Sequence, residues 1–451
     1  MSFDSQSVAV ENRKTGNAER VDLPMRAAAG GYYANLMRLY HHLSIPMHPV
    51  RFLFVFAQTL GLSSCAAPPS GKLEDSPDSY FVHTSNLHSI PPPRPRSRGL
   101  ALHLWETLFL IVCYAWFSVA CFLVRPHQVP KSDAADFDAR VPEETVENYL
   151  RRICIPKRYV SHYLLPLMSS VSTCTHAELL AFPASDIVNY KKLSHGQQHY
   201  TVCGGVNTVQ ARLAQGLTDV RTRASVTRVS PARDGAGVLV QWTTDTMEKS
   251  SDLSEEVFDR VVLAVSPDVA AKLFEPIADT LAQIPTIEVL SSVIAPWSTL
   301  REKGSDHILS KGDKDTARAC MHHSGNSSPA QRIMLRTRFE DHDARTEALH
   351  VMPSGVTVST CPLTENSEHG QTLKTARFTR TIRNTASQAA VKRLMRRRGS
   401  EAKRNDDWMN GDDGVWLTGA WCWDGMVLLE GCVVSAMRVA HDFGVEVPWE
   451  K

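Results

Sequence analysis

The C-terminal region contains the residues whose types and order are best suited to chemistry. Val415 to Thr418 predicts a short apolar strand that stops at Gly419, and Glu430–Gly431 opens a run with an apolar helical face. A helix that begins with an unobstructed glycine presents free backbone N–H groups and the positive end of its dipole. Such a helix end stabilises negative charge on a bound ligand. The alternative is an ordinary strand, loop and helix that closes an α/β sheet.

A second glycine pair, Gly204–Gly205, precedes another predicted helix. Its sequence is VNTVQARLAQGL, with apolar residues three to four positions apart, and Asn207 or Thr208 is expected to cap it. After this helix, the spacing of the apolar residues becomes the two-residue period that is typical of strands. Two short strands flank a turn at residues 233–235, and VFDRVVLAV predicts a buried strand that ends at Ser266–Pro267. This alternation of strands and helices predicts an α/β architecture.

Other residues offer weaker chemistry. His195 and His199 stand four apart, as two metal ligands on one helical face do, but no third ligand follows at a suitable spacing, so no metal site is expected. His322–His323 offers an acid or a base, although its Gly/Ser-rich surroundings favour a surface loop. The sequence contains neither a G-x-S-x-G nucleophile elbow nor a P-loop. It therefore does not support hydrolase or nucleotide-kinase activity.

The composition is that of an ordinary folded chain. Over 451 residues, 49 Lys and Arg stand against 48 Asp and Glu, and the formal charge of +1 produces no field that attracts nucleic acid. The ten cysteines are scattered without a C-x-x-C pair, which favours a reducing compartment or exposure to the cytosol. Residues 1–20 are polar and lack a secretory core, and we expect them to form a disordered tail.

Residues 100–124 form an unusually apolar segment. The sequence LALHLWETLFLIVCYAWFSVACFLV has Glu106 as its one formal charge, and as a helix it is long enough to cross a hydrocarbon layer of ~30 Å. Two interpretations stay open, a transmembrane helix and a buried or membrane-surface helix of a large enzyme. Arginines precede the segment, but Arg125 and Lys131 follow it, so charge favours a cytoplasmic N-terminal side only weakly. We expect a membrane-associated protein that faces the cytoplasm.

The most specific signal is a resemblance to a known family. Residues 198–274 and 415–444 resemble the amine-oxidase superfamily of FAD-dependent oxidoreductases, in particular the branch associated with cyclopropane-fatty-acid-synthase genes. The resemblance rests on Gly419–Ala420–Trp421, on Glu430–Gly431 and on Gly204–Gly205, in that superfamily's order along the chain. Upstream, DLPMRAAAGGYYANLMRLYHHLSIP is similar to the stretch that follows the first FAD-binding strands.

The resemblance implies a cofactor, FAD, and residues that bind it. Those expected to position the isoalloxazine ring are Gly419, Glu430 and Gly431; those expected to line the nucleotide side are Gly204, Gly205 and Val226; and those expected to approach the cofactor are Arg26, Gly30 and Gly31. In many amine oxidases a lysine holds a water near the flavin, and Lys191 or Lys192 is a weaker candidate for that role than for an exposed pair. No catalytic acid or base is assigned.

The implied fold is a partial FAD/NAD(P)-binding Rossmann-like domain with a mixed α+β substrate domain and one long apolar helix. Its expected organisation along the chain is a tail at 1–20, a remnant of the junction between the two domains at 21–62, a flexible Ser/Pro-rich insertion at 63–99, the apolar helix at 100–124, substrate-domain helices leading into FAD-domain strands at 131–274, the substrate domain with its loops at 275–410, and the closing strand and helix at 411–451.

One departure from the superfamily is serious. Its members normally begin with a strand and G-x-G-x-x-G, whose glycines bring the pyrophosphate to a helix N-terminus. No such motif occurs in this sequence. The expectation is therefore an N-terminally incomplete oxidoreductase, of the kind that removes hydride from a small or lipid-like substrate, which binds FAD weakly or not at all. The alternative is a membrane-associated pseudoenzyme or scaffold that retains the fold without the cofactor.

Overall fold

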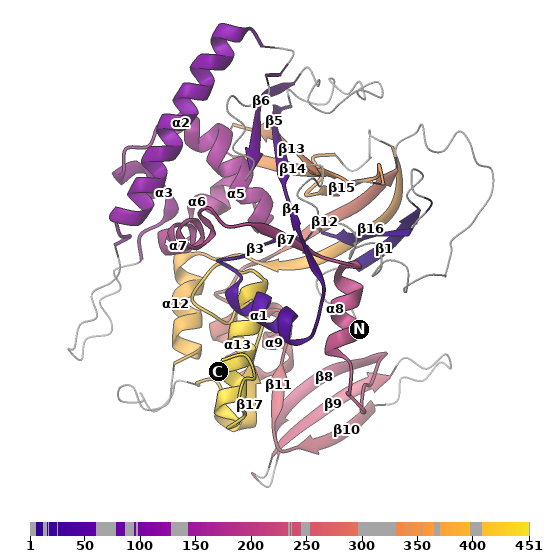
Figure 1. Cartoon of the computed structure of the whole chain (residues 1–451). Helices are drawn as coiled ribbons and strands as arrows, with labels where there is room; N and C mark the ends of the chain where they lie inside the picture. Colours follow the sequence, from indigo (N-terminus) through magenta and orange to yellow (C-terminus); the bar gives the residue numbers. More distant parts are fainter. Residues whose placement is uncertain are drawn as a thin grey trace.

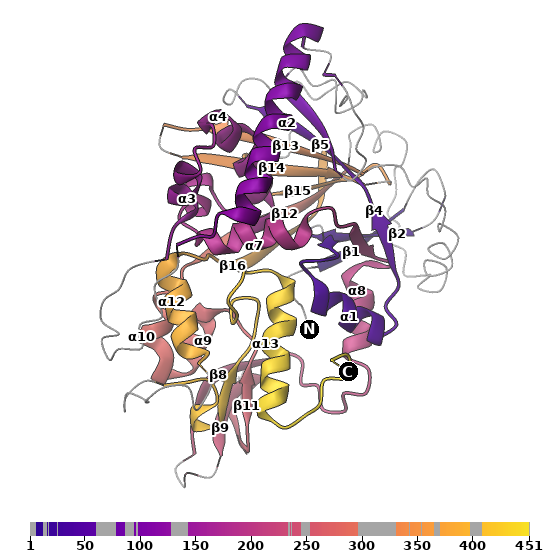
Figure 2. The ribbon, with the colours of Figure 1, turned by 60° about the vertical axis from the view of Figure 1, so that its left-hand side comes forward.

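The structure is a computed structural model. It describes residues 6–11, 16, 18–24, 26–59, 78–85, 94–95, 98–127, 143–232, 235, 237–244, 253–295, 331–341, 343–352, 354–364, 370–396 and 408–450. Figures 1 and 2 show a large sheet with the long helix α2 (Leu100–Leu123) beside it at one end of the molecule, and a smaller sheet at the other end. The predicted mixed α/β fold with one long apolar helix is confirmed.

The large sheet has seven strands among the described residues. Their spatial order is β16 (Gln371–Thr381), β12 (Thr286–Ala295), β15 (Thr357–Thr360), β14 (Ala344–Val351), β13 (Gln331–Phe339), β5 (Phe52–Gln58) and β6 (Ser79–Ser85). All neighbours are antiparallel except β5 and β13. Alternate residues of β5 enter two different cores, Phe52 and Phe56 on one side and Val55 on the other, as the period of two requires.

Short helices cover one face of this sheet and support α2. They are α3 (Val146–Arg152), α4 (Lys157–Tyr159), a π-helical turn at Val160–Leu164, α5 (Leu165–Ser172), α6 (His176–Leu180) and α7 (Ala184–Ser194). α5 packs on β13 and β14, and α2 packs on α7. Their apolar side chains share one buried core with α1 (Ala34–His42), which places the N-terminal part of the chain beside them.

The region expected to bind the nucleotide has a parallel pair of strands at its centre. β11 (Val261–Leu263) pairs with β17 (Val415–Leu417), and α13 (Leu429–Asp442) follows β17. Three helices share a core with this pair, namely α9 (Pro267–Leu273), α10 (Ala278–Leu281) and α12 (Thr385–Leu394). Beside them lies the antiparallel sheet β8 (Ala224–Pro231), β9 (Val238–Thr244) and β10 (Leu253–Phe258).

The single strand predicted in VFDRVVLAV is wrong. β10 ends at Phe258 and pairs with β9, whereas β11 begins at Val261 and pairs with β17. The chain changes sheets at Asp259–Arg260, where two charged side chains interrupt the apolar run. The apolar residues on either side therefore serve two different layers, which a one-dimensional pattern does not separate.

Two segments expected to lack structure contain strands. β1 (Gln6–Glu11) and β2 (Ala18–Leu23) form an antiparallel hairpin within the predicted tail and its continuation. β6 lies inside the predicted Ser/Pro-rich insertion, where Tyr80, Phe81 and Val82 are buried against β5 and its surroundings. The hairpin gains order by packing on α8 and β12, and β6 gains it by pairing with β5, because isolated short strands are at best marginally stable.

The N-terminal segment and the middle of the chain meet in a third sheet. Its order is β3 (Ala28–Ala29), β7 (His199–Val202) and β4 (Met47–Val50), and α8 (Gly205–Leu213) follows β7. Gly31 lies just after β3, and a Cβ atom placed there would stand 2.1 Å from the Leu193 carbonyl oxygen and 2.9 Å from Gln197 Cγ. The backbone itself is therefore packed against the end of α7.

We predict that Gly31→Ala lowers the free energy of unfolding by about 1–3 kcal/mol or more, because the methyl group must displace backbone. The matched control is Gly30→Ala, where the nearest atoms stand 3.5 Å from the new Cβ. That change is expected to stay within about 0.5 kcal/mol of the wild type. Urea denaturation of the three proteins checks this, and equal effects of both substitutions would contradict the packing role of Gly31.

Candidate functional site

The closing loop, residues 418–428, joins β17 to α13 and contains the first predicted site residue. Gly419 has φ 149°, a conformation that favours glycine, and its N–H donates to Ser435 Oγ of α13 over 3.0 Å. The Thr418 hydroxyl lies 2.8 Å from the same Ser435 oxygen. Ser435 therefore holds the start of the loop against the helix that the loop leads into.

Gly431 lies in the first turn of α13, as predicted, but the expectation that its backbone N–H is free for a ligand is wrong. Its N–H donates to the Leu428 carbonyl over 2.9 Å. A Cβ atom at Gly431 would stand 2.4 Å from Trp423 Nε1 and 2.6 Å from the Ala420 carbonyl oxygen. The indole of Trp423, whose Nε1–H donates to Met426 O, therefore packs directly on the helix start, and glycine is required there for close approach.

The carboxylate of Glu430 is directed to α1. Its Oε1 accepts hydrogen bonds from the backbone N–H of Asn35, over 3.0 Å, and from Asn35 Nδ2, over 2.8 Å. Its Oε2 accepts from the backbone N–H of Leu36 over 3.0 Å. The side chain is buried, and it satisfies N–H groups that the first turn of α1 would otherwise leave unpaired.

The N-terminal end of α8 is also closed by a carboxylate. Gly204 and Gly205 have φ +81° and +70°, and Asp22 of β2 accepts the Val206 N–H on both oxygens, at 3.0 and 3.1 Å. Asn207 and Thr208 were expected to cap this helix, but it begins at Gly205 with Gly204 at the cap position and no side-chain cap. Burial raises the pKa of Asp22, and the Val206 N–H offsets part of that rise.

The structure brings some of the predicted residues together. Gly30 donates its N–H to the Gln198 carbonyl at the start of β7, and Gly204–Gly205 follow the end of the same short strand. Glu430 joins the helix after Gly30–Gly31 to the C-terminal helix. Val226 lies in β8 of a different sheet, with 40% of its surface exposed.

Arg383 was missed by the sequence analysis and lies beneath the closing loop. It follows β16, is 2% exposed, and donates from Nη2 to the carbonyl oxygens of Trp421, Trp423 and Gly425 over 3.2, 2.9 and 3.1 Å. Its Nε and Nη1 have no hydrogen-bond partner among the described residues. A buried guanidinium with unused donors is costly unless something else binds them.

Asp186, in the first turn of α7, carries the complementary unused acceptors. It is 1% exposed, and neither carboxylate oxygen has a hydrogen-bond partner in the part of the chain that is described. Burial raises the pKa of Asp186 to about 7, and the charge of Arg383 offsets part of that rise. Burial first, and then the nearby Asp186 charge, also raise the pKa of Tyr32, whose ring lies 6.0 Å from the ring of Trp423.

No sequence motif marks this pair. Asp186 sits in a helical run and Arg383 in a polar stretch, and each pattern is typical of a solvated surface. Only the packing of α7, the end of β16 and the closing loop places them in one buried region. We name Asp186, Arg383 and the closing loop the buried polar site.

The weaker candidates lie elsewhere. His195 contacts Lys191 and the ring of Phe122, whereas His199 contacts the ring of Phe52. Lys191 lies over the Tyr114 ring of α2. The described residues contain no cluster of three or more His, Cys, Asp or Glu that would hold a metal ion, and His322–His323 and the loop from residue 304 lie outside them.

An open hollow of about 440 Å³ lies near these elements but is separate from the buried polar site. It is lined by residues of the segment from the end of α1 to the start of β4 and by one residue of β7, namely His41, Ser44, Ile45, Pro46, Met47 and Tyr200. None of the predicted site residues lines it.

The raised pKa of Asp186 predicts a specific pH dependence. The folded protein holds this proton up to about pH 7, whereas the unfolded chain releases it near the ordinary value of 3.8, so the contribution is present at low pH and is lost as pH rises through 7. Asp186→Asn removes this linkage. Between pH 5 and pH 8, the free energy of unfolding of Asp186→Asn should rise relative to the wild type by roughly 2 kcal/mol. Urea titrations at both pH values measure it, and a constant difference would contradict the assignment.

Known proteins are similar to this chain in fold and, over part of its length, in sequence. Residues 156–295 match the family described as flavin containing amine oxidoreductase. No curated protein sequence matches the chain. Solved structures of similar fold include two with TM-scores of 0.51 and 0.50. One is wild-type putrescine oxidase bound to putrescine, with a TM-score of 0.51 and 10% identity over 98% of this chain and 90% of that one.

The second is a CLA-producing fatty acid isomerase from P. acnes, with a TM-score of 0.50 and 8% identity over 94% of this chain and 88% of that one. At these identities the two structures establish the fold, and the family match adds sequence evidence from the central segment. The chain therefore has the fold of the FAD-dependent amine-oxidase superfamily, and its residues 156–295 match the flavin containing amine oxidoreductases in sequence.

Proposed function

We propose that the protein is a flavin-dependent oxidoreductase that removes hydride from a small or lipid-like substrate. The observation that carries the proposal is the buried polar site, where unused donors of Arg383 and unused acceptors of Asp186 lie beside the closing loop. The loop and the first turn of α13 together contain the residues, Gly419 to Gly431, that resemble the superfamily's flavin-closing segment. The family match of residues 156–295 supports the same cofactor class.

The ring end of FAD fits the chemistry of this site. The pyrimidine edge of an isoalloxazine has carbonyl acceptors beside an N–H donor. Arg383 Nε–H and Nη1–H supply donors for such an edge, and the Asp186 carboxylate supplies an acceptor. Trp423, already packed on Gly431, supplies an aromatic face beside the start of α13, and Trp421 lies against Gly419.

The phosphate end fits less well. Backbone N–H groups at a helix N-terminus are the usual partners of a dinucleotide pyrophosphate. At α8, Asp22 takes the Val206 N–H beside Gly204–Gly205, so a phosphate there would meet a carboxylate. We therefore propose that Gly204, Gly205 and Val226 contact the ribose and adenine portions, and that the ring supplies most of the affinity in this chain.

When bound, the flavin would accept the hydride and so supply the chemical step. The chain's own residues hold and shield the site. Arg383 fixes three carbonyl groups of the closing loop, and Glu430 holds α1 and Gly30–Gly31 against α13. The indole of Trp421 is buried and that of Trp423 is partly buried, and both exclude water from the loop.

The fold and the exposed surface of α2 bear on the substrate class. The two neighbours of similar fold are named for putrescine and for a fatty acid, so the fold accommodates both polar and lipid substrates. α2 exposes many large apolar side chains, including Trp105 and Leu108. We therefore propose association with a membrane and favour a lipid-like substrate taken from it.

We predict that riboflavin and FAD bind the full chain with dissociation constants within about fivefold of each other, because the ring dominates. Arg383→Gln should weaken both by about tenfold or more, the usual effect of losing hydrogen bonds to a charged group. Quenching of flavin fluorescence measures the binding. If neither riboflavin nor FAD bound the chain, that result would contradict the proposal and favour a scaffold without cofactor.

The matched control is Arg377→Gln, on β16, the strand that Arg383 follows, but exposed and paired with Glu288 at the surface. It should bind both flavins as the wild type does. Arg383→Lys, which keeps the charge but loses the fork of donors, separates a binding effect from unfolding when thermal melts are recorded on all variants. FAD binding a hundredfold or more tighter than riboflavin would show that a pyrophosphate site exists and would overturn the ring-dominated assignment.

A further inference from the structure

The exposed face of α2 is apolar along its whole length. Among its large side chains, Trp105, Leu108, Val112 and Phe122 are 65%, 55%, 59% and 48% exposed. None of the exposed residues of α2 carries a formal charge. Helices on the surface of a water-soluble domain normally turn their polar side outward, so this helix is inverted relative to that pattern.

The polar residues of α2 face the protein instead. His103, Glu106, Thr107 and Ser118 are all buried, with Glu106 only 2% exposed. Arg158 Nη2 lies 2.5 Å from Glu106 Oε2, and the Tyr163 hydroxyl donates to Glu106 Oε1. Both partners come from α4 and the π-helical turn. The only charge of α2 is therefore paired inside the domain and fastens the N-terminal half of the helix to it.

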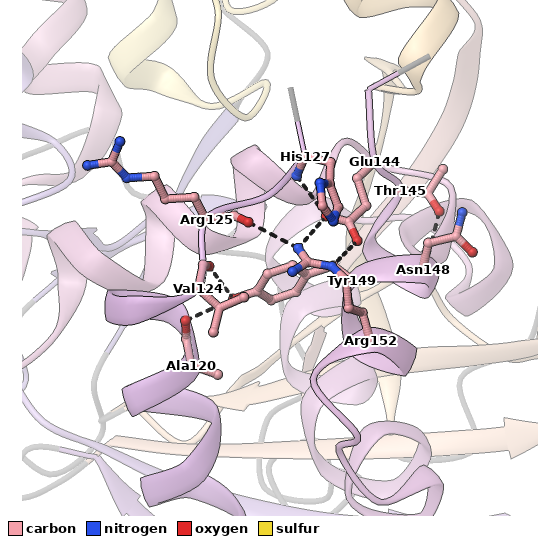
Figure 3. Close-up of polar contacts among 9 residues, drawn as sticks. All are labelled: Ala120, Val124, Arg125, His127, Glu144, Thr145, Asn148, Tyr149 and Arg152. Atoms are coloured by element: carbon pink, nitrogen blue, oxygen red, sulfur yellow. Dashed lines mark hydrogen bonds and ion pairs between the residues drawn. The ribbon is translucent and has the colours of Figure 1, made fainter. Parts of the chain in front are cut away.

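The C-terminal end of α2 is fastened separately, as Figure 3 shows. The Tyr149 hydroxyl of α3 lies 3.1 Å from the carbonyl oxygens of both Ala120 and Val124, in the last turn of the helix and at its C-terminal cap. Arg152 donates to the Arg125 carbonyl over 3.0 Å and forms an ion pair with Glu144 at 2.7 Å. These contacts tie the exit of α2 to α3.

The middle of α2 is also held along one side. Trp116 Nε1 donates to the Ile153 carbonyl over 2.8 Å, and Lys191 Nζ donates to the Tyr114 hydroxyl over 2.8 Å. A helix that crosses a bilayer is surrounded by lipid. This one would have to break contacts at both ends and in the middle, and would carry Glu106 into hydrocarbon.

Cations surround the apolar face. Arg125 follows the helix, Lys157 precedes Arg158 on α4, and Lys191 flanks the centre, and none of the three pairs with a carboxylate among the described residues. Unpaired cations beside a broad apolar surface match the anionic headgroups and acyl chains of a bilayer surface.

We infer that α2 is a surface anchor that lies along an anionic lipid bilayer with its outer face in the acyl region and does not span it. This inference rests on the proposed membrane association and specifies its geometry. The interfacial residues are Trp105, Leu108 and Val112 on the outer face, with Arg125, Lys157 and Lys191 at the headgroups. The attached domain remains on one side of the membrane.

The test is flotation of the full chain with vesicles of phosphatidylcholine, with and without phosphatidylglycerol. The wild type should bind the anionic vesicles more tightly, lose part of that binding in high salt, and be released by alkaline carbonate. Trp105→Glu/Leu108→Glu/Val112→Glu should reduce binding by at least about tenfold. Leu217→Glu/Leu253→Glu, at positions 59% and 62% exposed outside α2, is the matched control and should bind as the wild type does.

Three outcomes overturn the inference. The α2 variant could bind vesicles as the wild type does, or the bound wild type could resist extraction by carbonate. The third outcome is a wild type that binds no vesicles but forms a dimer, together with an α2 variant that is a monomer. Thermal melts and riboflavin titration accompany each variant. A folded α2 variant that keeps flavin binding but leaves the vesicles supports the anchor. A wild type that binds vesicles without binding flavin refutes the proposed oxidoreductase and leaves the anchor standing.

Discussion

The carboxylate of Glu430 is the interaction on which the rest of the site depends. It joins the first turn of α1 to the first turn of α13, two helices almost 400 residues apart in the chain. Three hydrogen bonds to a buried carboxylate fix the distance between these helix starts, because each lost bond would leave a buried group unpaired. The Gly30–Gly31 turn and the closing loop are thereby held in one region.

Against this well-satisfied contact, the buried polar site is unsatisfied. Arg383 Nη2 donates hydrogen bonds to the closing loop. Arg383 Nε and Nη1 and both carboxylate oxygens of Asp186 have no hydrogen-bond partner among the described residues. Evolution rarely keeps such groups in a core for stability alone, since apolar residues of similar volume often do as well. Buried polar groups without partners, one of them with a strongly shifted pKa, are typical of a site that a ligand completes.

α2 shows a second reversal of the usual rule, in this case on the surface. Its polar residues are buried and its apolar residues are exposed, because the packing of α4, the π-helical turn and α3 supplies partners for Glu106 and for the carbonyl groups at the helix end. The unpaired polar groups in the core and the exposed apolar face of α2 are both consistent with a protein that works at a lipid surface. A domain held at a lipid surface by α2 would keep its buried polar site within reach of substrates dissolved in that surface.

The sequence by itself determined the elements that depend on local order: α2, the strand and glycine before α13, the helix after Gly204–Gly205, and the resemblance that the family match supports. Apolar periodicity and glycine placement are properties of neighbouring residues, so one dimension suffices for them. The pairing of β10 and β11 with different strands, the turn of Glu430 towards α1, and the burial of Asp186 within the electrostatic influence of Arg383 were decided only by the tertiary structure. These contacts join residues far apart in the chain, and a charged side chain in a polar run looks the same whether it will face water or be buried by elements that fold over it.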